Sequence, residues 1–277
     1  MSRIIYEKAK EKILIVAHRG SFMGNIPCNI VPAYKAALLS GADMIEIDVD
    51  MARDGTLFIF HPGMEKAHLG FDGKLGELTR DEILSLRYQN YDRTPTQFGL
   101  NTLDEVFEEF GNKCFINVDK FWGHPKEIYE TIKRHGITDR VIVKSAPSEK
   151  VFSVLEELAP DLPFMPIVKK THPLHAELMR RNINYVGAEV LFDDESDEVA
   201  SPEFIDMMHG DGKLVWVNSI IYNYKAQLSA GHSDDTALTV GMDYGWGWLA
   251  KRGFDLIQTD WCGMLTSYLK ERGLLYR

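Results

Sequence analysis

Short apolar runs alternate with amphipathic stretches along the whole chain. The apolar runs are rich in β-branched residues, which is typical of buried strands. They predict eight strands, at residues 12–18, 43–49, 114–119, 140–144, 163–168, 185–191, 213–218 and 254–259. Helical periodicity follows most of them and predicts helices at 30–40, 102–111, 125–136, 147–158, 172–183, 201–210, 236–252 and 263–273.

This alternation favours a closed α/β fold, the (β/α)8 or TIM barrel. Eight strand–helix units spread over about 250 residues are typical of that fold. An open, doubly wound sheet has the same alternation, and periodicity alone does not exclude it. We predict the barrel because its eight units fill the length of the chain, with residues 1–277 forming a single domain.

Residues 51–101 depart from the alternation. The turn signal Asp54-Gly55 precedes the apolar run Leu57–His61, which predicts a hairpin that extends from the second strand. The following stretch, 62–101, is rich in glycine and charge and has one short helical pattern near 80–87. We therefore predict a small insertion at about 51–101, on the barrel face where loops build the site.

Composition and charge narrow the class of protein. The chain is 45% hydrophobic and 26% charged, as in a soluble globular protein with a sizeable core. With 31 basic and 41 acidic residues its net charge is −10, which disfavours general electrostatic binding to nucleic acid or anionic lipid. An anionic substrate would therefore need locally concentrated positive charge, such as a metal ion with Arg19 or a lysine.

The cysteines and the N-terminal segment predict a location. The three cysteines are odd in number and far apart, which indicates reduced thiols rather than a disulfide framework. The first twelve residues are charged, and the apolar stretch Ile13–Ala17 is too short for a signal peptide or a membrane span. We predict a cytoplasmic protein without stable membrane insertion, and the sequence leaves its oligomeric state open.

Two histidines and two carboxylates lie at or near predicted strand ends in the first quarter of the chain: His18, Glu46, Asp48 and His61. Strand alternation places Glu46 and Asp48 on one face, roughly 6.5 Å apart along the strand. Paired carboxylates at that spacing suit a hard divalent cation. Two imidazoles supply the proton acceptor and the proton donor that cleavage of a phosphate ester requires.

Further candidates lie on later strands. Asp119 ends the third strand and is placed to be a third oxygen ligand, although a lone carboxylate at a strand end is more often a capping residue. The convergence of three carboxylates with two histidines favours the functional interpretation. Glu189 is either a pocket residue or paired in the barrel core. Asn218 either binds substrate or caps a loop.

The order and spacing of these motifs resemble those of the glycerophosphodiester phosphodiesterases, within the wider class of phosphatidylinositol phospholipase C-like barrels. The matching segments are His18-Arg19-Gly20, Pro27-Cys28-Asn29, Gly41-Ala42-Asp43, Ile45-Glu46-Ile47-Asp48-Val49, Asp54-Gly55, His61-Pro62, Asn117-Val118-Asp119-Lys120 and Ile257-Gln258-Thr259-Asp260-Trp261. They extend from near the first predicted strand to the last, so the resemblance covers almost the whole chain.

The resemblance implies one divalent cation, Mg²⁺ or Ca²⁺, and hydrolysis of a phosphodiester to a phosphomonoester and an alcohol. The small-molecule substrate would be a deacylated phospholipid, which connects the protein to lipid and glycerol metabolism. Carried over position by position, the metal ligands would be Glu46, Asp48 and Asp119, the acid–base pair His18 and His61, and the ligand of a phosphate oxygen Arg19.

Two departures from the family pattern matter. Cys28 stands where the family usually has glutamate, so any role of that carboxylate is lost or altered. Lys120 directly follows Asp119 instead of lying two residues along, which predicts that Lys120 faces away from the pocket. Lys144, at the end of the fourth predicted strand, then becomes the better candidate for a second phosphate contact.

Two alternatives stay open. The same histidines could serve a phospholipase D-like reaction or a lyase that forms a cyclic phosphate. A non-catalytic barrel that binds a phosphorylated ligand is the other alternative. The intact set of His18, Glu46, Asp48 and His61 disfavours it, because binding alone does not require two acid–base groups beside a metal.

Overall fold

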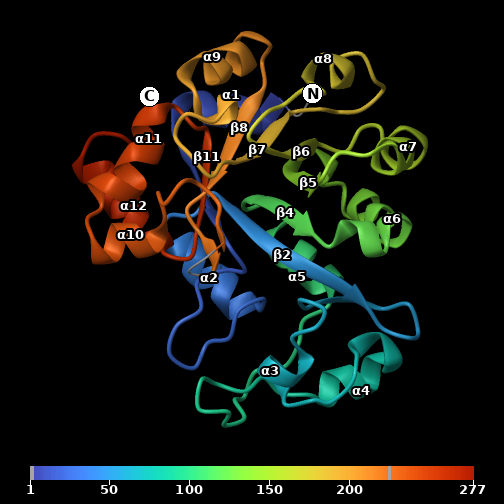
Figure 1. The fold of residues 1–277 in the computed structure, drawn as a ribbon. Helices are drawn as coiled ribbons and strands as arrows, with labels where there is room; N and C mark the ends of the chain where they lie inside the picture. The colour runs from blue at the N-terminus through green and yellow to red at the C-terminus, as the bar shows by residue number, and fades with distance from the viewer. Residues whose placement is uncertain (1–2, 224–225) are drawn as a thin grey trace.

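The computed structural model describes residues 3–223 and 226–277 (Figure 1). Within them, eight parallel strands form the barrel: β1 (Leu14–Ala17), β2 (Met44–Met51), β4 (Phe115–Asp119), β5 (Val141–Ser145), β6 (Phe164–Lys169), β7 (Gly187–Leu191), β8 (Leu214–Asn218) and β11 (Leu256–Thr259). The strand β1 pairs with both β11 and β2, so the sheet closes on itself. The predicted (β/α)8 barrel is confirmed, and the open sheet is excluded.

Helices connect and surround the strands (Figure 1). They are α1 (Arg3–Glu11), α2 (Val31–Leu39), α5 (Leu103–Phe110), α6 (Pro125–His135), α7 (Glu149–Leu158), α8 (His175–Leu178), α9 (Pro202–Gly210), α10 (Asp234–Thr239), α11 (Trp248–Arg252) and α12 (Cys262–Glu271). Among the described residues, no helix is both long enough and apolar enough to span a lipid bilayer.

The strands are apolar on both faces because each face packs against a separate core. In β1, Leu14 and Val16 point into the barrel, where they join an interior cluster with Met44, Met165 and Trp216. The alternate residues of the strand belong to the larger cluster between the barrel and its helices. Both faces of a parallel sheet are covered in this way, which explains why the strands read as nearly continuous apolar runs.

The helix α1 was not predicted. It covers the N-terminal end of the barrel, where Ile5 and Ala9 are buried in the interior cluster. Its sequence is short and strongly charged, so it does not predict a helix by itself. The helix is stabilised because its apolar residues pack against the end of the barrel.

Two of the predicted helices differ from the structure. The prediction at 172–183 is wrong in length, because α8 covers only His175–Leu178. After α8 the chain forms tight turns, in one of which the main-chain nitrogen of Arg180 donates to the Glu177 carbonyl. The prediction at 236–252 is divided into α10, a π-helical segment η5 (Asp243–Gly247) and α11. A Cβ at Gly245 would lie 2.7 Å from the Ala237 Cβ, so glycine permits the close approach of η5 to α10.

The segment after β2 forms the expected hairpin. The strand β3 (Leu57–Ile59) pairs antiparallel with β2, and the chain then forms α3 (Glu65–Leu69) and α4 (Arg80–Ser85) before α5. These elements surround a cluster of their own, which includes Phe58, Phe60 and Tyr88. In Figure 1 they lie beyond the far end of β2, on one side of the barrel.

Candidate active site

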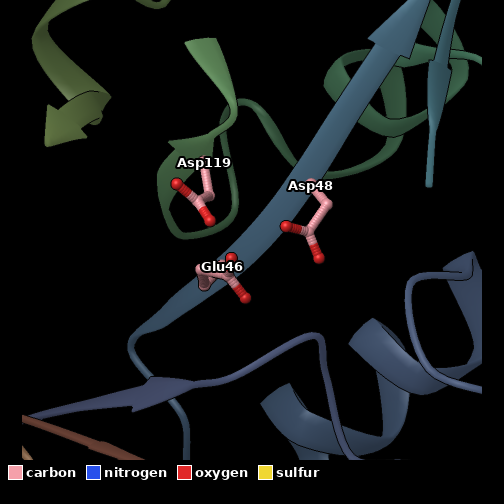
Figure 2. A group of neighbouring side chains, drawn as sticks. All are labelled: Glu46, Asp48 and Asp119. Carbon is pink, nitrogen blue, oxygen red and sulfur yellow. The ribbon is translucent and has the colours of Figure 1, made fainter. Parts of the chain in front are cut away.

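The three acidic residues meet where β4 ends, beside the middle of β2. These strands pair in parallel with Glu46 opposite Asn117 and Asp48 opposite Asp119. One oxygen from each of Glu46, Asp48 and Asp119 can be chosen so that all lie within 4.8 Å of one another. Figure 2 shows Glu46 and Asp48 on β2 and Asp119 at the end of the neighbouring strand. The structure thus brings together the predicted oxygen ligands.

The triad suits a divalent cation. Glu46 and Asp48 are buried, and Asp119 is partly exposed. Burial and the nearby charge of Asp48 raise the pKa of Glu46 above its ordinary value. The Asp48 Oδ1 atom is buried without a hydrogen-bond partner among the described residues. A hard cation would satisfy this oxygen and offset the crowded negative charge, so the residues present fit a Mg²⁺ or Ca²⁺ ion.

Arg19 approaches the triad because the chain turns sharply after β1. Its φ of 56° lies in the left-handed region. Its main-chain nitrogen donates to Glu46 Oε2 at 2.9 Å, and its Nε lies 3.0 Å from Asp48 Oδ2. The next residue, Gly20, has a φ of 83° and packs so tightly that a Cβ there would lie 2.8 Å from the Ala33 carbonyl carbon. The turn requires glycine at this position.

Asn29 orients Asp48, a contact that sequence reasoning missed. Its Nδ2 donates to Asp48 Oδ2 at 2.8 Å, and its Oδ1 accepts from the Tyr34 hydroxyl at 2.9 Å. The Asp48 Oδ2 atom is therefore engaged by Asn29 and lies beside Arg19, and Oδ1 is left for a ligand. The signal was present in the motif Pro27-Cys28-Asn29, since asparagine is one of the few residues at ease with a positive φ, here 56°.

His18 follows β1 and is held by Asp260, which follows β11. The His18 Nδ1 atom lies 2.8 Å from Asp260 Oδ1, so Nδ1 carries a proton that it donates to the carboxylate. Burial lowers the pKa of His18, but the hydrogen bond to Asp260 and the charge of Glu46 outweigh it and raise the pKa above 6.5. The sequence motif contained Asp260 without revealing this role, because 242 positions separate the two residues.

His61 follows β3 and is oriented by the main chain. Its Nδ1 lies 2.9 Å from the Pro62 carbonyl oxygen, which can only accept a hydrogen bond. Nδ1 of His61 therefore also carries a proton. Neither His18 nor His61 has a hydrogen-bond partner at Nε2 among the described residues. Both imidazoles thus keep Nε2 for another molecule.

The expectation that Lys120 faces away from the pocket is wrong. Lys120 Nζ lies 2.7 Å from Asp119 Oδ2 and 3.9 Å from Asp48 Oδ1. The Lys120 backbone has a φ of 60°, and this left-handed residue breaks the strand alternation that would otherwise turn the side chain to the opposite face. Burial alone would raise the pKa of Asp119, but the hydrogen bond and charge of Lys120 lower it below its ordinary value.

The other predicted substrate-binding residues form a buried network deeper in the barrel. Lys144 Nζ lies 2.6 Å from Glu189 Oε2 and 3.7 Å from the centroid of the Trp216 ring. Asn218 Nδ2 donates to Glu189 Oε1 at 2.6 Å. Of the two readings that the sequence left open for Glu189, pairing is what the structure shows. The buried Oδ1 of Asn218 has no partner among the described residues and is left to accept a hydrogen bond.

Cys28 lies beside the site without thiolate character. Burial raises the pKa of the Cys28 thiol to about 12. Its Sγ is 3.9 Å from His68 Nδ1, and burial and the charge of Arg19 lower the pKa of His68. Both groups are therefore neutral near pH 7 and bring no charge to this side of the site.

Comparison with known proteins shows what this chain is similar to. A protein-family model described as a domain of unknown function, DUF4996, matches residues 164–269. The glycerophosphodiester phosphodiesterase of Caldanaerobacter subterraneus subsp. tengcongensis is 32% identical over 148 residues, 48% of this chain and 58% of that protein. The enzyme of that name from Bacillus altitudinis is 32% identical over 141 residues, 47% of this chain and 57% of that protein.

Solved structures share the fold over nearly the full chain. A glycerophosphoryl diester phosphodiesterase from Parabacteroides distasonis has a TM-score of 0.76 at 18% identity and covers 95% of this chain and 88% of its own. An Oleispira antarctica phosphodiesterase, solved with the product sn-glycerol-3-phosphate, has a TM-score of 0.67 at 19% identity. The match covers 96% of this chain and 99% of that chain. The resemblance to glycerophosphodiester phosphodiesterases is confirmed, although the chain spans less than three fifths of the curated relatives' length.

Proposed function

We propose that this protein is a hydrolase that cleaves glycerophosphodiesters to glycerol phosphate and an alcohol. In this proposal Glu46, Asp48 and Asp119 hold one divalent cation, Mg²⁺ or Ca²⁺. His18 and His61 transfer the protons. The observation that carries the proposal is the meeting of three carboxylate oxygens within 4.8 Å. Both histidines are joined to this triad through the main chain: the nitrogen of Arg19, next to His18, donates to Glu46, and the nitrogen of Phe60, next to His61, donates to the Asp48 carbonyl at 2.9 Å.

The charges near the triad support a phosphodiester as substrate. When bound, the cation would neutralise charge on a non-bridging phosphate oxygen and polarise the phosphorus centre. Arg19 keeps its two Nη groups free of hydrogen bonds to described residues, so they can donate to a second phosphate oxygen. Lys120, 3.9 Å from Asp48 Oδ1, adds a further positive charge at the same place.

The free Nε2 atoms give the two histidines complementary work. One imidazole accepts a proton from the attacking hydroxyl or water, and the other protonates the leaving oxygen. In each ring the Nδ1 atom is occupied by a neighbour, Asp260 for His18 and the Pro62 carbonyl for His61. This fixes which nitrogen faces the substrate and saves the reorganisation that a freely rotating ring would need.

The buried network deeper in the barrel offers groups for the hydroxyls of the substrate. Lys144 donates, and the unpartnered Oδ1 of Asn218 accepts, while Glu189 keeps both in place. In our proposal these three residues contact a hydroxyl-bearing part of the substrate. The Oleispira antarctica phosphodiesterase, a structural neighbour with a bound glycerol phosphate, is consistent with a polyol phosphate as one product.

A turnover assay with glycerophosphocholine and related diesters, with and without Mg²⁺ or Ca²⁺, tests this proposal. His18→Ala or His61→Ala should lower kcat about 10²–10⁴-fold with the fold preserved. His135→Ala is the matched control, because His135 pairs with Asp104 away from the site and its loss should leave turnover intact. Undiminished turnover in both site variants, or full activity after removal of metal by a chelator, would refute the mechanism.

Product analysis separates hydrolysis from its rivals. ³¹P NMR should show a phosphomonoester that accumulates with the alcohol. A persistent cyclic phosphate would instead identify a lyase. Tight binding of glycerol phosphate without turnover of any diester would identify a non-catalytic barrel.

A further inference from the structure

Asp234, the first residue of α10, is a buried carboxylate outside the metal site. It is 3% exposed, and no lysine, arginine or histidine among the described residues pairs with it. Four donors surround it: Ser219 Oγ at 2.7 Å, Thr259 Oγ1 at 2.8 Å and Trp246 Nε1 at 2.7 Å from Oδ1, and the main-chain nitrogen of Asp260 at 2.9 Å from Oδ2.

These donors come from separate elements of the barrel rim. Ser219 follows β8, Thr259 ends β11, and Trp246 lies in η5. A carboxylate in an apolar surrounding is costly unless hydrogen bonds replace its hydration. Burial raises the pKa of Asp234, and the four hydrogen bonds oppose that shift. The Asp234 carboxylate thus holds together β11, η5 and the residue after β8.

Asp234 is connected to His18 through Asp260. Asp234 holds the main chain of Asp260, and the Asp260 carboxylate accepts from His18 Nδ1 at 2.8 Å. The main-chain nitrogen of His18 also donates to the Thr259 carbonyl at 3.2 Å. Asp260 itself follows β11, and its side chain is about one third exposed. Among the described residues, the main-chain nitrogen of Asp260 donates its hydrogen bond to Asp234.

We propose that Asp234 is a positioning residue of the active site: its carboxylate fixes the main chain of Asp260 and thereby the orientation of the His18 imidazole. The inference rests on the proposed acid–base role of His18. An imidazole serves proton transfer only if its free nitrogen points at the reacting oxygen, and a misplacement of about 1 Å can cost roughly 10²-fold in rate.

The variant Asp234→Asn breaks this one link. An asparagine retains one oxygen, and three of the four donors meet Oδ1, including the Trp246 indole, which cannot accept a hydrogen bond. The amide oxygen therefore stays at the Oδ1 position, and the amide NH₂ faces the main-chain N–H of Asp260. Two donors then meet, and Asp260 loses its anchor while the shape of the side chain is kept.

Asp255 provides a matched control at the other end of β11. It is 2% exposed and accepts from the main-chain nitrogen of Val215 at 2.7 Å, from His209 Nε2 at 2.9 Å and from Arg277 Nη1 at 2.7 Å. Asp255→Asn removes a buried charge from the residue that precedes β11, and Asp255 has no contact with His18 among the described residues. Any loss of activity due to general destabilisation should appear in both variants.

Steady-state kinetics on the full chain give the first test. Asp234→Asn should lower kcat about 10–10²-fold with KM nearly unchanged, because the ground-state contacts to phosphate are untouched. Asp255→Asn should leave kcat at the wild-type value. In an Asp260→Ala background, Asp234→Asn should have little further effect. Equal losses in the two Asn variants, or additive losses with Asp260→Ala, would overturn the inference.

A second test does not depend on turnover. In protein labelled with ¹⁵N-histidine, at a pH above the pKa of His18 and with the His18 signals assigned by His18→Gln, the wild type should show one neutral tautomer with the proton on Nδ1. Asp234→Asn should shift or mix these signals, and Asp255→Asn should not. An unchanged His18 signal in Asp234→Asn overturns the inference. The expected change in a protein that cleaves no glycerophosphodiester would support the positioning role and remove the proposed function alone.

Discussion

Neutralising Glu46 should have opposite effects on stability with and without metal. One oxygen of each residue of the triad can be chosen so that all lie within 4.8 Å of one another, and two unit negative charges at that separation repel by about 3.5 kcal/mol at an effective dielectric constant of about 20. Glu46 has two such neighbours. Arg19, 3.0 Å from Asp48, and Lys120, 2.7 Å from Asp119, offset much of this repulsion.

The variant Glu46→Gln keeps an oxygen for the main-chain nitrogen of Arg19, which Glu46 Oε2 now accepts at 2.9 Å. The remaining change is the replacement of a buried carboxyl, which on folding must either take up a proton or carry a crowded negative charge, by a neutral amide. In a chelator, we expect the free energy of unfolding to rise by about 1–2 kcal/mol. The wild-type protein should gain about 2.7 kcal/mol at a cation concentration one hundredfold above its Kd, and the variant should gain far less.

Urea and thermal unfolding in a chelator and in Mg²⁺ or Ca²⁺ measure both effects. The order of stability should therefore reverse: the variant is more stable without metal, and the wild type is more stable with it. Glu65→Gln is the control, because Glu65 is a buried carboxylate outside the triad and its loss should leave the response to metal unchanged. A Glu46→Gln protein that metal stabilises as much as the wild type would refute the reasoning.

Three further predictions follow from buried groups. Burial and the charge of His175 lower the pKa of His172 to about 4. As the pH falls, His172 therefore binds a proton in the unfolded chain before it does in the folded protein, and the free energy of unfolding should fall by up to about 3 kcal/mol between pH 6.5 and pH 4. Urea unfolding at several pH values measures this. Asp260→Asn removes the carboxylate charge that helps to raise the pKa of His18, so the limb of the pH–rate profile that belongs to His18 should move to lower pH. Lys144→Met leaves Glu189 buried without its cation and should cost about 3–5 kcal/mol in urea unfolding, most of which Lys144→Met with Glu189→Gln should restore.

Much of the architecture could be predicted from local pattern. The eight predicted strands all correspond to barrel strands, because a strand buried on both faces consists almost entirely of apolar residues and is recognised from them alone. The capping boxes at Thr79 and Thr102 mark the starts of α4 and α5, since the cap contacts lie within one turn. The helices at 172–183 and 236–252 were misjudged because long-range packing, at Gly245 among other places, interrupts a pattern that is locally helical.

Some residues of the candidate site could be predicted from the sequence, and their hydrogen-bond partners could not. The shared face of Glu46 and Asp48 follows from the pleat of one strand, and the motif order then pointed to Asp119, His18 and His61. The partners of these residues could not be predicted. Asn29, Asp260 and Asp234 reach the site by contacts between distant segments, and no periodicity encodes such contacts.

By itself, then, the sequence determined the alternation of strands and helices and the spacing of the carboxylates within β2, because both depend on side chains only a few positions apart. The tertiary structure alone decided that Asp48 lies opposite Asp119, that Lys120 turns into the site, and that Asp260 holds His18. Each of these depends on strand register, a left-handed backbone or barrel closure, which arise only when the whole chain packs.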